Sequence, residues 1–235
     1  MDARDENAAR VVERAAGRLG ELALRAAGGQ FEIIVNGVFL MDTRNGESER
    51  LLVRRALREA PDGAHLLVGG LGVGFSLAEA LRSHRVGRVT VVEIEPTIVA
   101  WGRTILARFS DGALADPRVE VVIDDIAAFL RRSADAFDVI CLDVDNGPGW
   151  TVADANGALY TEEGLALLRA RLAPGGTLAV VVAGEGQESK LVFVFPDGPV
   201  LPRPDKEIVE AGRKKVRAEP EVRARRKPKE TAQPA

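Results

Sequence analysis

The sequence predicts an α/β fold with a doubly wound, mostly parallel sheet, preceded by a small N-terminal helix and a β-hairpin. Short apolar runs of strand length alternate with segments of helical spacing through most of the chain. A glycine-rich turn, 69–74, follows the apolar run 66–68, and Glu93 ends the next run, 89–93. Such a turn with an acid roughly 20 residues further on is typical of the nucleotide-binding half of a doubly wound sheet.

The N-terminal part is expected to contain two helices and a hairpin. Apolar residues recur at helical spacing over 11–26, which predicts an amphipathic helix. The apolar runs 31–35 and 38–41 flank Asn36-Gly37, and this dipeptide favours the two-residue turn of a β-hairpin. A second helix is expected over 47–60.

The central part alternates strands with helices. Its apolar runs are short, continuous and rich in β-branched residues, as expected for strands buried on both faces. Two of its helices begin with typical N-terminal signals, Pro96 in one and Thr161-Glu162-Glu163 in the other. The expected strands are 66–68, 89–93, 119–123, 137–142 and 177–182, and the expected helices are 75–81, 96–105, 126–132 and 161–172.

The C-terminal part departs from this alternation. Only eight positions, 183–190, separate the fifth strand from the apolar run 191–195, which is too few for a crossover helix and predicts a hairpin-like turn. A sheet face left bare by the missing helix could be covered by a second copy, so a homodimer is a hypothesis. The predicted parts are residues 1–60, a sheet domain over 61–200 that ends just after Pro196–Pro199, and a charged tail over 201–235.

Composition indicates one globular domain with a modest extension. The chain has 235 residues, of which 46% are hydrophobic and 29% charged. The sequence has no apolar run long enough to span a membrane, and a charged N-terminus stands where a signal peptide would be apolar. A cytoplasmic protein is therefore expected. One cysteine, Cys141, and two histidines leave no internal disulfide and no Cys/His metal cluster, so no metal is expected. Cys141 lies within an expected strand, which indicates a core residue.

The tail is basic, whereas the rest of the chain is acidic. From Arg203 to Ala235 there are eleven Lys/Arg and six Asp/Glu, a charge of +5 against −8 for the remainder of a chain whose total is −3. A basic tail can bind nucleic acid. Here the acids are interleaved and no aromatic side chain is available for base stacking, which argues against nucleic acid and favours a solvated, disordered tail.

Carboxylates end three consecutive strands: Glu93, Asp125 with Asp124 before it, and Asp143. Since parallel strands end along one edge of the sheet, these acids are expected to meet in the ligand crevice. Glu93 could accept both hydroxyls of a ribose and Asp125 the exocyclic amine of an adenine, which leaves Asp143 for chemistry. No Gly-Lys-Ser/Thr follows the turn, which argues against nucleotide hydrolysis.

The spacing of the glycines favours an adenosyl-sulfonium cofactor over a dinucleotide. Gly70-x-Gly72-x-Gly74 differs from the Gly-x-Gly-x-x-Gly pattern of dinucleotide sites. Adenosyl-sulfonium compounds deliver an alkyl group to a nucleophile. An amine nucleophile must be neutral to attack, and a neighbouring carboxylate can orient it and take its proton. Further acids that could attract a cationic substrate are Asp145, Asp154, Glu47 and Glu49.

With these motifs the chain resembles the spermidine synthase family of polyamine aminopropyltransferases, which share the class I methyltransferase fold. The resemblance runs from about Phe31 to Val182. The segments that carry it are the hairpin followed by Glu47-Ser48-Glu49, Val68–Gly74, Val92–Glu95, Asp116–Glu120 with Asp124-Asp125, and Phe137–Asp143 followed by Gly147-Pro148 and Leu159-Tyr160.

The resemblance implies a transferase of polyamine biosynthesis that moves an aminopropyl group from decarboxylated S-adenosylmethionine to an amine. It implies that Asp143 is the general base. The residues implied to bind the donor are Gly69, Gly70, Gly72, Gly74, Glu93, Asp124 and Asp125, and those implied to bind the amine substrate are Glu49, Asp145 and Tyr160.

Three departures from the family pattern leave two alternatives open. The family has an aspartate in the glycine turn where Gly72 stands, Tyr-His-Glu at 47–49, and Asp-Ser/Thr-Ser/Thr-Asp-Pro where this chain has 143–148. The first alternative is a methyltransferase that uses S-adenosylmethionine itself, because an acid at position 72 would repel the methionine carboxylate. The second is a non-catalytic binding protein that has kept the fold.

Overall fold

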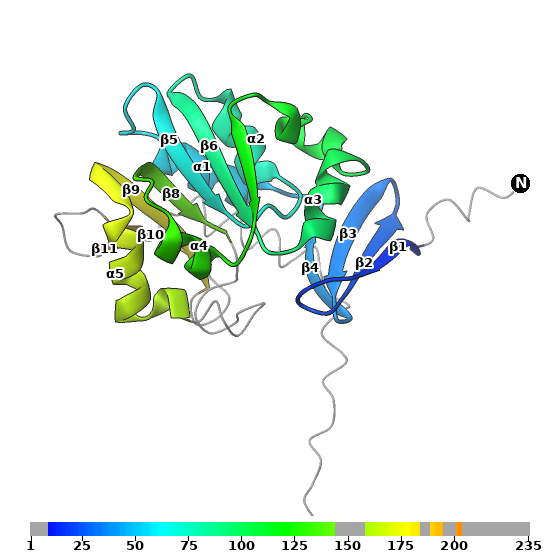
Figure 1. The fold of residues 1–235 in the computed structure, drawn as a ribbon. Helices are drawn as coiled ribbons and strands as arrows, with labels where there is room; N and C mark the ends of the chain where they lie inside the picture. The colour runs from blue at the N-terminus through cyan, green and yellow to red at the C-terminus, as the bar shows by residue number, and fades with distance from the viewer. Residues whose placement is uncertain (1–8, 144–157, 184–188, 195–200, 204–235) are drawn as a thin grey trace, which may run out of the picture.

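The computed structural model describes residues 9–143, 158–183, 189–194 and 201–203. These residues form a four-stranded antiparallel sheet, here called the small sheet, and a seven-stranded sheet with helices on both faces, the large sheet (Figure 1). The small sheet stands beside the end of the large sheet at which α3 begins (Figure 1). None of the described helices is long and apolar enough to span a membrane.

The small sheet is an antiparallel meander in which each strand pairs with the next. Its strands are β1 (Arg10–Ala16), β2 (Glu21–Ala27), β3 (Gln30–Val35) and β4 (Val38–Asp42). Asn36 and Gly37 have φ angles of 50° and 77°, so both adopt the left-handed conformation that a two-residue hairpin turn requires. The predicted hairpin is therefore confirmed.

The predicted helix over 11–26 is wrong, because these residues form β1 and β2. Gly17 and Gly20 bracket the turn between the strands, and Gly20 has a φ of 119° that a helix interior excludes. In β2 the run 22–24 is buried, whereas Val11 and Val12 in β1 are 43% and 41% exposed. The apolar residues thus pack from a strand against the core rather than from one face of a helix.

The large sheet has the strand order β11-β10-β9-β8-β5-β6-β7. The five strands from β9 to β7 are parallel, and the predicted alternation of strands and helices is confirmed along this part. The parallel strands are β5 (Ala64–Gly69), β6 (Val86–Glu93), β7 (Val119–Ile123), β8 (Phe137–Leu142) and β9 (Leu172–Ala183). The helices are α1 (Glu47–Ala56), α2 (Phe75–Arg82), α3 (Pro96–Arg103), α4 (Ile126–Arg132) and α5 (Glu162–Ala170), with 3-10 turns at Ala107–Ser110 and Ala113–Ala115.

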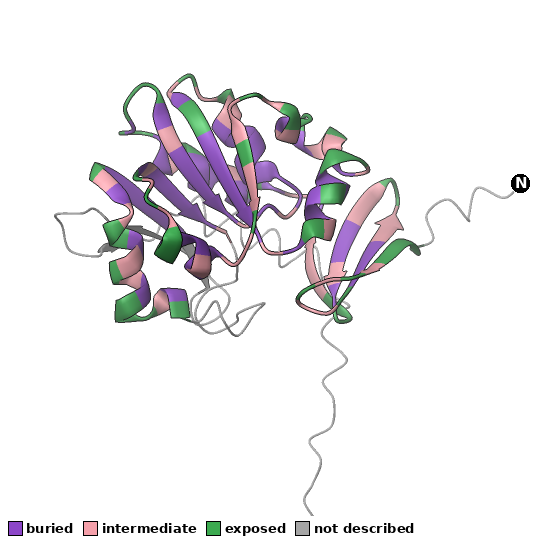
Figure 2. Ribbon diagram, viewed as in Figure 1, coloured by how far each residue is buried: buried purple, intermediate pink, exposed green. Residues whose placement is uncertain are grey.

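Each face of the large sheet has its own hydrophobic cluster. Leu66 and Val68 of β5 face the cluster formed with α1, α2 and α3, whereas Leu67 faces the cluster formed with α4 and α5. Figure 2 shows the central strands buried along most of their length. This two-sided burial is why the strands are continuous apolar runs in the sequence.

The chain reverses its direction of winding at β5. From β5 it passes to β6 and β7 on one side, and then returns to β8 and β9 on the other. The crevice for a ligand lies at such a switch point, outside the C-terminal ends of the strands. The glycine turn after β5, Glu93 at the end of β6 and Asp143 after β8 all meet there.

The C-terminal end differs in part from the expectation. β10 (Ser189–Val194) pairs antiparallel with β9, and only residues 184–188 separate the two, so the predicted hairpin in place of a crossover helix is confirmed. β9 begins at Leu172, five residues before the expected strand 177–182, and includes Pro174-Gly175-Gly176, with a register irregularity against β8. A short strand, β11 (Leu201–Arg203), pairs with β10, so the folded part extends into the predicted tail. Residues 195–200, which include Pro196–Pro199, and residues 204–235 lie outside the described residues. The homodimer stays a prediction.

Candidate functional site

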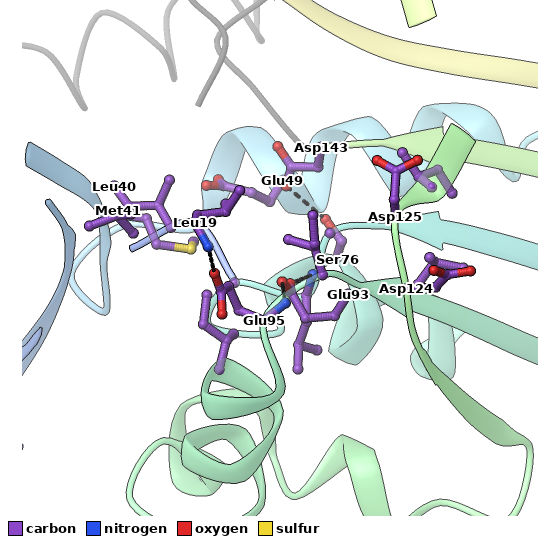
Figure 3. Close-up of a pocket in the computed structure, with 18 of the residues that line it drawn as sticks. Leu19, Leu40, Met41, Glu49, Ser76, Glu93, Glu95, Asp124, Asp125 and Asp143 are labelled. Carbon is purple, nitrogen blue, oxygen red and sulfur yellow. Dashed lines mark hydrogen bonds between the residues drawn. The ribbon is translucent and has the colours of Figure 1, made fainter. Parts of the chain in front are cut away.

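A cavity of about 120 Å³ lies at the C-terminal ends of β5, β6 and β8, between the two sheets (Figure 3). The small sheet and its β1–β2 turn supply only apolar residues, here called the apolar side: Leu19, Val35, Leu40 and Met41. The large sheet, its turns and its helices supply all six acids, here called the acidic side: Glu49, Glu93, Glu95, Asp124, Asp125 and Asp143. They also supply six further apolar lining residues: Leu71, Phe75, Val92, Ile94, Ile98 and Ile126.

The glycine turn forms the floor between β5 and α2. Gly70 and Gly72 line the cavity with φ angles of 84° and 53°. Gly69 lies behind it, where an added Cβ would be 2.8 Å from a methyl group of Leu142. Gly74, with a φ of 94°, precedes the first residue of α2. Of the four glycines predicted to bind the donor, two therefore face the cavity and two shape the turn.

Glu93 is held in place by the turn. Its carboxylate accepts hydrogen bonds from the backbone N–H groups of Leu71 at 2.8 Å and Glu95 at 2.9 Å, and also from Gly72. The residue is 5% exposed, and this burial raises the pKa of its carboxyl group, while the backbone N–H groups act in the opposite direction. Each carboxylate oxygen can accept two hydrogen bonds, so with three bonds made, capacity remains for one hydroxyl of a ligand.

The other three N–H groups of the turn also have acceptors in the protein. Gly70 donates to Val92 O at 2.9 Å, Val73 to Met41 Sδ at 3.2 Å, and Gly74 to Leu71 O at 2.8 Å. The Met41 sulfur also fills the space in front of Gly72, since a Cβ on Gly72 would lie 2.2 Å from it. The sequence offered no signal for Met41, because a methionine in a strand is ordinarily a core residue.

Asp124 and Asp125 line the cavity on the side of α4. Asp125 is the N-cap of α4, and its Oδ1 accepts the N–H of Ala128 at 2.8 Å. Asp124 forms an ion pair with Arg132 from the last turn of the same helix. Both acids therefore have structural partners, and their binding of the adenine stays a prediction.

Asp143 and Glu49 lie at the opposite side of the cavity (Figure 3). Asp143 follows β8, and its Oδ2 accepts a hydrogen bond from Ser76 Oγ at 3.3 Å. Glu49 of α1 is 3% exposed and accepts a hydrogen bond from Ser48 Oγ at 2.6 Å. Ser76 was not predicted, although a hydroxyl in the first turn of the helix after a glycine loop is a signal that could have indicated it.

Some predicted residues are not part of this cavity. Tyr160 is half-buried, packs against the cluster of α4 and α5, and is not among the described residues that line the cavity. Glu47 pairs with Arg54 at 2.5 Å on the exposed face of α1. Asp145 and Asp154 lie outside the described residues.

Cys141 is a core residue, as predicted. It is completely buried in β8, and burial raises the pKa of its thiol far above the usual range. Among the residues that the structure describes, no three His, Cys, Asp or Glu side chains are grouped as metal ligands.

Fold and cavity together define a protein of the methyltransferase-like α/β class with an acidic pocket at the strand ends. The chain belongs to the spermine/spermidine synthase family: the family described as "Spermine/spermidine synthase domain" matches residues 48–191, more than half of the 235 residues. The resemblance seen in the sequence is thereby confirmed.

Two curated relatives are named polyamine aminopropyltransferases. The chain is 36% identical over 134 residues to polyamine aminopropyltransferase 2 of Pseudomonas aeruginosa, covering 55% of this chain and 36% of the relative. It is 38% identical over 136 residues to polyamine aminopropyltransferase of Mycobacterium tuberculosis, covering 56% of this chain and 25% of the relative. The chain thus spans about a third or less of the length of these relatives.

Solved structures of the family share the fold. A spermidine synthase in complex with the transition state analogue AdoDATO gives a TM-score of 0.65 at 20% identity, covering 89% of this chain and 64% of that chain. The spermidine synthase from Thermotoga maritima gives a TM-score of 0.61 at 22% identity, covering 74% and 57%. At these identities the likeness establishes the methyltransferase-like fold.

Proposed function

We propose that this chain transfers an aminopropyl group from decarboxylated S-adenosylmethionine to an amine. One observation carries the proposal: six carboxylates and no Lys, Arg or His are among the described residues that line the cavity. A cavity of this kind favours a cationic ligand and disfavours an anionic one. The family membership supports the same reaction class.

The acidic side separates the two adenosyl donors by charge. Both carry a sulfonium cation, but S-adenosylmethionine also carries a carboxylate. A ligand carboxylate in the cavity would lie among six carboxylates, with no Lys, Arg or His among the described lining residues, and would meet repulsion from these acids. The decarboxylated donor avoids this repulsion, which favours aminopropyl over methyl transfer.

Each carboxylate has a separate role in the proposed reaction. Glu93 accepts a hydrogen bond from a ribose hydroxyl, and Asp125 accepts the adenine amine next to its capping bond. Asp143 orients the acceptor amine and takes its proton as the nitrogen attacks the carbon beside the sulfonium. The new C–N bond replaces the C–S bond, whose electrons stay on sulfur, and methylthioadenosine leaves as a neutral thioether.

The neighbours of Asp143 support this role. Ser76 Oγ donates a hydrogen bond to Asp143 Oδ2 and so holds the carboxylate that lines the cavity. Glu49 adds negative charge on the same side of the cavity, where a second ammonium group of the acceptor would bind. Roles for Asp145 and Tyr160 in binding the amine remain part of the proposal, because neither residue is placed in the cavity.

Calorimetry with three ligands tests the proposal. We expect the full chain to bind decarboxylated S-adenosylmethionine about 10-fold or more tightly than S-adenosylmethionine, with methylthioadenosine also bound. Tighter binding of S-adenosylmethionine would favour the methyltransferase alternative, for which Gly72 is the specific observation. Absence of binding of all three at millimolar concentration would favour the non-catalytic alternative.

A further inference from the structure

Glu95 is a buried carboxylate that the proposed reaction does not use. It lies two residues after Glu93, directly before α3, and is 1% exposed. A carboxylate so deeply buried is stable only when hydrogen bonds satisfy its oxygens. Glu95 finds these bonds in a distant part of the chain, the turn between β1 and β2.

Both oxygens of Glu95 bind backbone N–H groups of this turn. Oε2 accepts from Arg18 at 3.0 Å and Oε1 accepts from Leu19 at 2.5 Å. Figure 3 shows the bond from Leu19. A Cβ on Gly17 would lie 2.3 Å from Oε2, so a glycine is needed for the turn to approach the carboxylate this closely.

Asn36 holds the same turn from the other side. Its Nδ2 donates to Leu19 O at 2.6 Å, and its Oδ1 accepts from Glu21 N at 3.0 Å. The backbone N–H of Leu19 is therefore fixed by Glu95 and its backbone C=O by Asn36. Leu19, whose backbone is held at both polar groups, lines the cavity.

Glu95 also contacts the site itself, since its backbone N–H donates to Glu93 Oε1 at 2.9 Å. One residue thus joins the carboxylate proposed to bind the ribose to the turn that forms part of the apolar side. We infer that Glu95 is a positioning residue that fixes the β1–β2 turn to the cavity, so that Leu19 packs against the bound adenosyl ligand. The inference rests on the proposed function only in its choice of ligand.

A double-mutant cycle on the full chain tests this inference, with methylthioadenosine as the calorimetric probe. Glu95→Gln keeps one acceptor and turns an amide NH₂ towards the second backbone N–H, and we expect it to weaken binding about 10-fold. Leu19→Ala, which leaves the carboxylate in place, should weaken binding similarly. Because Glu95 acts through Leu19, the double variant should bind no more weakly than either single variant. Losses that add, or a Glu95→Gln variant with wild-type affinity, would overturn the inference.

Glu32→Gln is the matched control. Glu32 is a buried glutamate of the small sheet, 7% exposed, that pairs with Arg25 and Arg44 and does not line the cavity. It should lower the melting temperature without changing affinity. If it weakened binding as much as Glu95→Gln, general loosening of the small sheet would explain both results and the inference would fail.

Hydrogen exchange separates this inference from the proposed function. In Glu95→Gln the amides of Arg18 and Leu19 should exchange faster than in the wild type, whether or not any ligand binds. Gly17→Ala breaks the same contact from the turn and should give the same result if Glu95→Gln does not fold. Unchanged exchange of both amides would contradict the inference. A wild-type protein that binds none of the ligands would contradict only the proposed function.

Discussion

The large sheet meets the cavity with the ends of its strands, whereas the small sheet meets it with a turn and the side chains of β3 and β4. Strand ends place Glu93 and Asp143 at the same edge, where backbone hydrogen bonds fix them. The small sheet contributes aliphatic side chains and the flexible thioether of Met41, which can adapt to the shape of a ligand. We therefore expect the acidic side to determine the chemistry and the apolar side to determine how closely the ligand fits.

The acidic side should show the largest single effect at Asp143. Asp143→Asn removes the proposed base, and we expect kcat for aminopropyl transfer to fall about 10²- to 10⁴-fold while donor affinity stays close to wild type. Ser76→Ala leaves the carboxylate but removes its hydroxyl partner, so a smaller fall is expected. Steady-state kinetics with both variants checks this, and transfer by Asp143→Asn at the wild-type rate would exclude Asp143 as the base.

Glu93→Gln should affect binding rather than turnover. Only one of the two polar atoms of the glutamine amide is an acceptor, so the side chain cannot accept hydrogen bonds from both the turn and a ribose. We therefore expect the affinity for methylthioadenosine to fall about 100-fold. Glu120→Gln is the control, since Glu120 is an exposed glutamate of the neighbouring strand that pairs with Arg88. Calorimetry should find wild-type affinity for the control. Equal affinities for the wild type, Glu93→Gln and Glu120→Gln would show that Glu93 does not bind the ligand.

Gly72→Ala tests where the two sides meet. The alanine would have to adopt a φ of 53° and its Cβ would meet Met41 Sδ, so we expect a loss of about 1–3 kcal/mol in the free energy of unfolding. Met41→Ala in the same chain should restore the steric part of this loss but not the backbone part. Urea unfolding of the single and double variants measures both, and no restoration would show that Met41 yields without cost.

The smallest expected effect is a dependence of stability on pH. Burial raises the pKa of Glu93 above its ordinary value of 4.5. Between the two values the folded chain holds a proton that the unfolded chain has released, so the contribution of Glu93 makes stability fall as pH rises through that window. Glu93→Gln should lack this contribution. Urea unfolding at several pH values measures the difference in the free energy of unfolding between the wild type and Glu93→Gln. A difference that does not change with pH would contradict the prediction.

The sequence predicted the large sheet far better than the small one. Strands buried on both faces, such as β5 and β8, are continuous apolar runs that flanking glycines and helices set apart. In β1 and β2 the alanine-rich pattern fits a helical period as well as a strand, so a helix was predicted. The glycines at 17 and 20, which bracket the turn, were a signal against a helix that the prediction did not use. β11 has only three residues, too few to form a pattern.

The acidic side was largely predicted and the apolar side was not. Glu93, Asp125 and Asp143 follow strands, so the topology alone brings them together. Leu19 and Glu95 are 76 residues apart in sequence, and their contact depends on how the two sheets pack. No local pattern indicates such a contact, which is why these residues were missed.

The five backbone N–H groups of the glycine turn, 70–74, all have acceptors within the protein. In phosphate-binding loops the corresponding groups are the donors that hold the anion. Adenine nucleotides share their base and ribose with the proposed donor, so the polar atoms that hold adenosine do not distinguish them. Because the N–H groups of the turn already have acceptors and several carboxylates lie beside it, we expect the pocket to disfavour a phosphate as the 5′ substituent. ATP should then not compete with the proposed donor.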